Sequence, residues 1–441
     1  MKIKLYSTVL LLTLLSACVD ELNVEPRASI PDTNPIFDRV SAEQAVRGIY
    51  SALYYGATFE SIGYLSGDNV QWTGSQSQVQ EFINHRVNAD NSTINGSWVA
   101  IYRLINRANN AIARIPGVTD AQLTDALRNQ LIGEAHFLRA LAYFDLARVW
   151  GGVPIVTNPT LSPTDNSGIA RSSREETYQR VLADLQIAEE LLPEKTERFR
   201  ATRKTAWALR ARLHLYRNQW DLAAEYASKL IDDSNYELVR PYGAFFLDNA
   251  RGTRESVFEI FYNGTTEVNG HRTQWQPQEK GGTRQWAPSD AVVSLLLDPE
   301  KGGNRNVLIA RDNQNRWYGN LYYRNPGSDP AFVIRIAELY LIRAEARAQL
   351  NDLQGALEDL NKVRDRAELP ALDLGLKEEV LLAIEDERRL EFAFEPHRWF
   401  DLVRTGRAQE VLSINEPWRL LLPLPISQLQ IDHALEQNEG Y

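Results

Sequence analysis

Apolar residues recur at intervals of three and four along most of the chain, which is the spacing of an amphipathic helix. The first such stripe opens on Ser41 to Gln44, a sequence typical of a capping-box helix start. A second capping sequence, Ser172 to Glu176, precedes another stripe that Pro193 ends. The stripes cover residues 42–53, 98–115, 127–146 and 178–192. This pattern predicts a mainly α-helical protein.

Two later segments resemble each other. Residues 208–231 align with residues 341–364 when Asn218 is placed on Asn351, and each then shows a helix, a tight polar turn and a second helix. Small residues at the helix crossing complete a pattern that resembles tetratricopeptide repeats. A degenerate third copy begins near Arg139. Because the copies keep no strict period, we expect a weak array of helical hairpins rather than a regular solenoid.

The segment 233–330 has a different character. It contains ten of the 25 glycines, helical periodicity disappears, and residues 256–262 form a strand-like run. A long irregular insertion between helical hairpins is uncommon unless it carries a function. We therefore predict a helical scaffold over 41–232 and 331–441, with a loop-rich ligand-binding region containing short strands over 233–330.

The first residues have the character of an export signal. Lys2 and Lys4 precede a short apolar run, and Leu15-Ser16-Ala17-Cys18 resembles the lipobox of bacterial lipoproteins. We predict a signal peptide over 1–17, lipidation of Cys18 and a polar tether over 18–40. Acyl chains would then hold the protein on a membrane. An ordinary secretory signal that contains a cysteine is the alternative.

Charge and cysteine content exclude several functions. The net charge is −10 and no basic run occurs, so we expect no nucleic-acid partner. Cys18 is the only cysteine, so its lipidation would leave no thiol for disulfides, metal binding or catalysis. The six histidines are scattered, so we expect no metal and no cofactor, although an adventitious Ca²⁺ remains open.

Catalytic signatures do not emerge either. The sequence has no nucleophile elbow and no glycine-rich phosphate loop. Its many carboxylates suggest the acid pair of a glycosidase, but the segment 387–406 has the alternating charges of a helix. We expect ion pairs that brace helices from Glu387, Arg388, Arg389, Glu391 and Asp401. The protein is therefore predicted not to be an enzyme.

Five blocks of sequence together resemble one family. They follow the lipobox in order, and they include Gly133-Glu134-Ala135-His136 and Trp150-Gly151-Gly152-Val153-Pro154 in the first block. The blocks cover residues 133–154, 171–193, 200–216, 387–406 and 421–441. In this order they resemble the RagB/SusD family of SusD-like nutrient-uptake lipoproteins.

The resemblance implies a mostly helical fold on a tetratricopeptide-like scaffold. It also implies a position on the outer membrane, lipid-anchored and facing the cell exterior, with a SusC-like TonB-dependent transporter as partner. The implied function is to capture an oligosaccharide and deliver it to that transporter. Two alternatives stay open: the same fold binding peptides, and a tetratricopeptide-like interaction scaffold without a small ligand.

Aromatic residues in the loops are the candidate contacts for a sugar. Tryptophan and tyrosine offer flat apolar faces with a polar edge, which suits a hydroxylated ring. Five tryptophans lie in helical stripes or family blocks and are expected to pack inside: Trp98, Trp150, Trp207, Trp220 and Trp399. The predicted ligand-binding residues are Asp68, Asn69, Gln71, Trp72, Trp275, Trp286, Trp317, Tyr318 and Tyr322, with Tyr323 beside them. We expect the aromatic residues to form one exposed platform with Asp68, Asn69 and Gln71 at its edge; the alternative is that these aromatics only hold loops in place.

Overall fold

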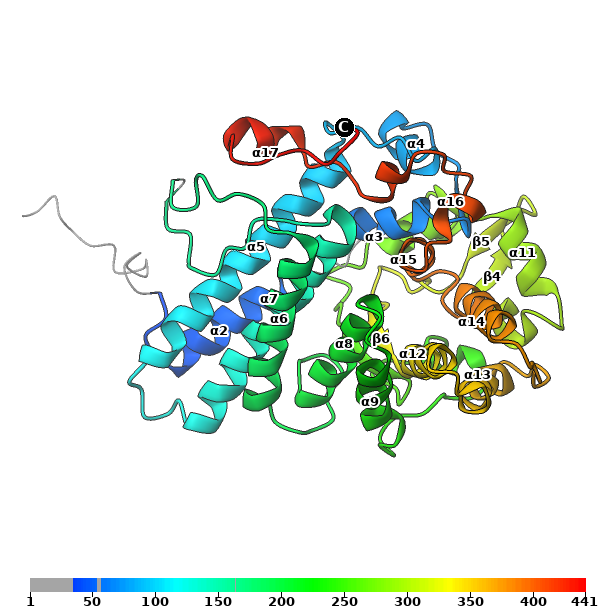
Figure 1. The fold of residues 1–441 in the computed structure, drawn as a ribbon, viewed down its shortest axis with the longest axis horizontal. Coiled ribbons are helices and arrows are strands. Elements are labelled where there is room, and N and C mark those ends of the chain that lie inside the picture. Colours follow the sequence, from blue (N-terminus) through cyan, green and yellow to red (C-terminus); the bar gives the residue numbers. More distant parts are fainter. Residues whose placement is uncertain (1–34, 54–56, 163) are drawn as a thin grey trace, which may run out of the picture.

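The computed structural model describes residues 35–53, 57–162 and 164–441. The predicted signal peptide and Cys18 lie outside the described residues. The fold is mainly helical, as predicted, and this part of the chain also holds three two-stranded antiparallel sheets (Figure 1). None of its helices combines the length and apolar character that a membrane span requires.

The first part of the chain is helical. Its helices are α2 (Arg39–Tyr50), α3 (Ala57–Leu65), α4 (Ser77–Ile83), α5 (Ser92–Arg114), α6 (Asp125–Trp150) and α7 (Arg174–Leu191). The prediction that Ser41 begins α2 is wrong. Asp38 is the cap, and Ser41 is the third helical residue, whose amide donates to the Asp38 carboxylate at 2.7 Å. The predicted capping box of α7 is confirmed between Ser173 and Glu176.

The repeated segments form two helical hairpins. These are α8 (Arg203–Tyr216) with α9 (Trp220–Ile231), and α12 (Ile336–Gln349) with α13 (Leu353–Arg366). Asn218 and Asn351 both take the left-handed backbone conformation, with φ of 55° and 66°. In each turn the next amide donates to the carbonyl five residues earlier at 2.9 Å. The two turns are therefore equivalent, as the sequence alignment predicts.

Helices α6 and α7 form the degenerate third pair. Arg139 on α6 forms a buried ion pair with Asp184 on α7 at 2.7 Å. Arg343 on α12 pairs with Asp359 on α13 at the same distance. Residues 151–173 join α6 to α7, so this pair keeps the buried arginine but not the tight turn.

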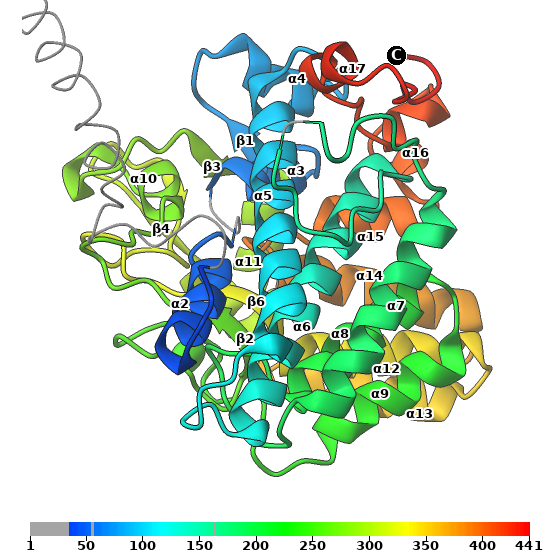
Figure 2. The same cartoon turned by 90° about the vertical axis from the view of Figure 1, so that its left-hand side faces the viewer.

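Two of the three sheets join the insertion to the scaffold, and the third lies within the insertion. The pairs are β1 (Val70–Trp72) with β3 (Trp286–Pro288), β2 (Ser256–Ile260) with β6 (Ala331–Arg335), and β4 (Ile309–Arg311) with β5 (Trp317–Gly319). The predicted strand at 256–262 is confirmed as β2. The insertion is less irregular than expected, because it also holds α10 (His271–Trp275) and α11 (Asp290–Leu297). In Figure 2 its segment with α10 and β4 lies on the opposite side of the molecule from α9 and α13.

The chain ends in short helices. They are α14 (Lys377–Glu391), α15 (Arg398–Arg404), α16 (Ala408–Val411) and α17 (Ile426–Ile431). The single helix predicted over 387–406 is wrong, because the chain leaves the helix between Glu391 and Arg398. Pro396 lies in this break; proline lacks an amide proton and disfavours helical backbone in the residue before it. Short 3-10 helices cover Ile115–Gly117, Tyr242–Phe245, Gln278–Lys280, Gly303–Leu308 and Pro417–Leu420.

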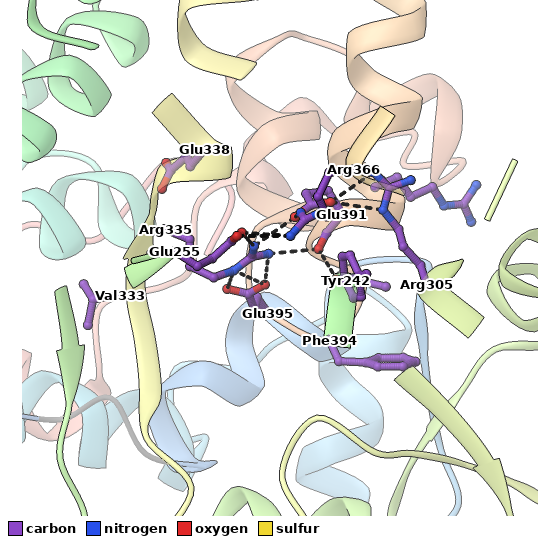
Figure 3. A network of polar contacts seen from close by, with 12 residues as sticks. Tyr242, Glu255, Arg305, Val333, Arg335, Glu338, Arg366, Glu391, Phe394 and Glu395 are labelled. Carbon is purple, nitrogen blue, oxygen red and sulfur yellow. Dashed lines mark hydrogen bonds and ion pairs between the residues drawn. The ribbon is translucent and has the colours of Figure 1, made fainter. Parts of the chain in front are cut away.

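A buried network of charged side chains joins α13 and α14 to β2 and β6 (Figure 3). Its members are Arg305, Arg335, Arg364, Arg366, Glu255, Glu387, Glu391 and Glu395, so four positive side chains meet four negative ones. Arg335 contacts Glu255 at 2.8 Å, Glu391 at 2.9 Å and Glu395 at 2.6 Å. The predicted bracing role of Glu387 and Glu391 is confirmed, and Arg388 likewise pairs with Asp401 at 2.8 Å.

The network separates the pKa values of its carboxyl groups. Burial acts to raise the pKa of Glu391, but Arg366, Arg305 and Arg335 outweigh it and lower that pKa to about 2. Burial raises the pKa of Glu395 to about 7, because Arg335 only partly offsets it. Glu391 is therefore ionised at neutral pH and holds the network together, while Glu395 changes its protonation state near neutral pH.

Candidate functional site

Three strands bring Trp72 and Trp317 into one corner of the molecule. In the β1–β3 pair Trp72 lies opposite Trp286, and β5, which begins at Trp317, lies next to β3. Arg284 connects the two sides: its carbonyl accepts from Thr73 Oγ1 at 2.6 Å, and its Nε donates to the Trp317 carbonyl at 2.8 Å. We call residues 70–73, 284–288 and 309–319 the sheet corner.

Four of the predicted platform residues lie inside the protein. The exposed fraction is 1% for Trp275, 3% for Trp286, 1% for Tyr318 and 1% for Tyr322. The expectation that these side chains are exposed is therefore wrong. Their burial fits the alternative given above, that these aromatic side chains hold the loops in place.

These aromatics form an inner core beneath the sheet corner. Tyr64 of α3 has its ring centre 5.1 Å from Trp286 and 5.5 Å from Trp275. His271 stacks on Tyr322 at 4.5 Å. Edge-to-face and offset aromatic contacts of this kind stabilise a fold beyond the area that they bury. The loop-rich insertion is consequently built on a packed aromatic base.

Trp72, Trp317 and Tyr323 keep part of their side chains exposed. The Trp72 indole lies against Gly74, where any larger side chain would overlap it. The Arg311 guanidinium lies over the Trp317 ring, 4.1 Å from its centre. The Tyr323 hydroxyl accepts a long hydrogen bond from the backbone amide of Asn249, at 3.4 Å. Of the predicted platform tryptophans, only Trp72 and Trp317 therefore reach the surface.

The polar residues predicted for the edge of the platform, Asp68, Asn69 and Gln71, make most of their contacts inside the protein. Asp68 forms ion pairs with Arg398 at 2.8 Å and Arg389 at 2.9 Å. Burial acts to raise the pKa of Asp68, but its bonds to Arg398 outweigh that and lower it. Asn69 is buried and accepts from Arg389 Nε at 2.9 Å. Only Gln71 is exposed, and its amide donates to the Pro288 carbonyl at 2.8 Å.

Sequence reasoning missed the cations beside Trp317. Arg311 and Arg316 are exposed at the two ends of the β4–β5 turn, and Arg284 is partly buried below them. The available signal was the sequence Arg311-Asp-Asn-Gln-Asn-Arg316-Trp317, in which a polar turn places two arginines beside one tryptophan. Within the described ranges, no group of three potential ligands could hold a metal ion.

Comparisons with known proteins identify the family. The model of the SusD family matches residues 257–419, and a related model, described as starch-binding and associating with the outer membrane, matches residues 29–215. This chain belongs to the SusD/RagB family. It is thus a SusD-like protein, of a glycan-binding family whose members are binding proteins and not enzymes.

Individual relatives extend over nearly the whole chain. SusD-like protein P38 of Formosa agariphila is 28% identical, over 98% of this chain and 97% of its own. A SusD-like protein of Bacteroides ovatus is 24% identical, over 95% of this chain and 86% of its own.

Solved structures share the fold. A SusD superfamily protein from Bacteroides vulgatus superposes with a TM-score of 0.84 at 21% identity, covering 91% of this chain and 99% of its own. A laminarin-binding SusD-like protein gives a TM-score of 0.81 at 23% identity, covering 92% and 100%. Surface glycan-binding protein A from Bacteroides fluxus gives 0.78 at 22% identity, with the same coverage.

Proposed function

We propose that this protein is a cell-surface lipoprotein that captures an oligosaccharide and delivers it to a SusC-like TonB-dependent transporter. The observation that carries the proposal is the sheet corner, where Trp72 and Trp317 remain partly exposed on a packed aromatic base. An indole covers the apolar face of a pyranose, and neighbouring amide and guanidinium groups serve its hydroxyls. The laminarin-binding and surface glycan-binding structures with the same fold support a sugar as ligand.

The site predicts weak binding. Each ring stacked on an aromatic gains about 0.5–1.5 kcal/mol beyond area burial, if a sugar behaves as an aromatic partner does. Each hydrogen bond adds about 0.5–1.5 kcal/mol net, and association itself has a cost to offset. The binding free energy that remains after this cost corresponds to a dissociation constant of roughly 1 mM to tens of micromolar. Such an affinity suits a protein that passes its ligand on.

Calorimetry with a panel of glycans tests the site. We expect Trp72→Ala and Trp317→Ala each to weaken binding without a change in melting temperature. Trp207→Ala is the matched control, because that indole is also partly exposed but lies on α8 and donates to Glu189 at 2.8 Å. Unchanged binding in a Trp72→Ala/Trp317→Ala double variant would exclude the sheet corner. Binding of peptides and of no glycan would favour the peptide-binding alternative.

The transporter is tested separately. Detergent-solubilised membranes of the native host, with a tag on this chain, should yield a TonB-dependent transporter in the eluate. The Cys18→Ala variant, which should lack the lipid anchor, is the control. Repeated absence of any such transporter from the eluate would count against delivery of the glycan to a transporter, but it would not test glycan binding by this chain.

A further inference from the structure

A second pocket lies between α5, the loop of residues 151–173 and α17. Its volume is about 590 Å³, and small-ligand sites measure roughly 300–1,000 Å³. Trp98 of α5, Ile169 of the loop and Gln428 of α17 are among the side chains that line it. Figure 1 shows α17 beside the start of α5, and none of the described lining residues belongs to the sheet corner. We call this cavity the α5–α17 pocket.

Hydrogen bonds hold the three walls of the pocket together. The Tyr102 hydroxyl of α5 donates to the Pro154 carbonyl of the loop at 2.8 Å. The backbone amide of Gly168 donates to the carboxylate of Asp432, which follows α17, at 2.8 Å. The pocket is therefore formed without a ligand, and a preformed site reduces the ordering that binding must impose.

Trp98 is buried, as predicted, but its polar atom is unused. Its exposed fraction is 4%, and its ring packs edge-on against Trp150 at 5.3 Å. Within the described chain the indole nitrogen of Trp98 has no acceptor, yet unlike those of Trp72 and Trp275 it is not sealed from solvent. An indole N–H only donates, so Trp98 offers one hydrogen bond to an acceptor that enters the pocket.

Three other lining side chains add donors and acceptors. Asn166 donates to Thr160 Oγ1 at 2.5 Å, which leaves its own carbonyl oxygen without a donor among the described residues. The side chain of Gln428 makes two long contacts with described residues, both of 3.4 Å and both through its amide nitrogen. The Ser167 hydroxyl bonds to no described residue. Sugar hydroxyls both donate and accept, so they match this mixture.

The charges that line the pocket balance each other. Arg103 is exposed and forms no ion pair with the described chain. Asp432 accepts from the amides of Ala434 and Gly168, and these hydrogen bonds lower its pKa and keep it ionised at neutral pH. The other walls include aliphatic side chains such as Ile169. One positive and one negative charge favour a neutral ligand, and aliphatic walls suit the C–H face of a sugar ring.

We propose that the α5–α17 pocket is a second glycan-binding site, which takes one neutral sugar residue. Trp98 donates to an oxygen of that sugar, and Asn166 and Gln428 contact its hydroxyls. Tyr102, whose ring is partly exposed, covers part of its C–H face. A purely apolar ligand is disfavoured, because it would remove these polar groups from water without replacing their hydrogen bonds. The inference rests on the glycan-binding function proposed above and adds a site outside the sheet corner.

Titrations of a variant without the sheet-corner tryptophans test the pocket. The probes are neutral hexasaccharides of glucose, xylose and mannose, each added to the purified full-length protein in detergent. We expect Trp72→Ala/Trp317→Ala still to bind one of them saturably in calorimetry. The indole N–H resonance of Trp98, assigned with Trp98→Phe, should shift with the same saturation curve.

Variants of the pocket separate a built site from weak surface contact. In the same background, Val99→Phe and Gln428→Ala should each weaken the remaining binding about tenfold. Val99 lines the pocket with 37% of its side chain exposed, so a phenyl ring there would fill part of the cavity. Val40→Phe is the matched control, because it makes the same change at a valine of α2 that is 46% exposed. An equal loss in the control would overturn the proposal.

Three further outcomes would also decide against it. If the double variant binds no hexasaccharide that the wild type binds, the proposed function stands and the second site is refuted. If the wild type binds no hexasaccharide, nor any glycan in the calorimetric panel, both are refuted. A Trp98 shift that stays linear with sugar concentration would show an adventitious contact and no site.

Discussion

Removing Arg335 should severely destabilise the protein. This arginine is fully buried and donates to Glu255, Glu391 and Glu395. After Arg335→Met, Glu255 and Glu391 keep Arg366, but Glu395 has no arginine left among the described residues. Removing one partner from a buried ion pair costs about 3–5 kcal/mol. That is a large part of the roughly 5–15 kcal/mol by which a typical protein is stable.

Urea unfolding at two pH values tests this reasoning. The loss in Arg335→Met should be larger at pH 8 than at pH 5.5, because Glu395 is buried at lower cost when protonated. The double variant Arg335→Met/Glu395→Gln should recover about 2 kcal/mol at pH 8, within the range of measured pair couplings. A single variant within about 1 kcal/mol of the wild type, or a double variant no more stable than the single one, would refute it.

Four other predictions follow from the same structure. Glu395→Gln should remove a fall in unfolding free energy of roughly 3 kcal/mol between about pH 4.5 and 7, because the folded chain, with its carboxyl pKa raised to about 7, holds a proton that the unfolded chain releases; parallel pH curves would contradict this. Trp286→Ala should cost about 3–5 kcal/mol in urea unfolding, and a loss no larger than that of Trp72→Ala would argue against its core role. Asn218→Val should cost about 1–2 kcal/mol and Asn218→Gly almost nothing, a difference that thermal melting measures. Cys18→Ala should abolish fatty-acid labelling and membrane partitioning, and a variant that keeps both would disprove lipidation there.

The scaffold was predictable because its signals are local. Asn218 and Asn351 occupy the same place in two short aligned segments, and a left-handed turn is a property of a few residues. The break after α14 was also visible in principle, since Pro396 interrupts the charged run. Local patterns therefore predicted the hairpins and most helices, with errors at helix ends.

The surface of the site was not predictable in the same way. Trp286 and Trp72 both resemble loop residues in the sequence. In the β1–β3 pair, however, Trp286 is buried and Trp72 stays partly exposed. That pairing joins Val70 to Pro288, which are 218 residues apart in the sequence. Burial decided by such distant contacts leaves no periodic trace, so Trp275, Tyr318 and Tyr322 were also misjudged.

The attachment of Asp68 and Asn69 to the C-terminal helices has a consequence for the order of folding. Their partners Arg398 and Arg389 are 330 and 320 residues away in the sequence, so these contacts form only after a very large loop closes. The hairpin α8–α9 needs only neighbouring residues and can form early. We therefore expect the segment that positions Trp72 to be completed late, and a chain that stops before α14 to form its first hairpins without fixing this segment.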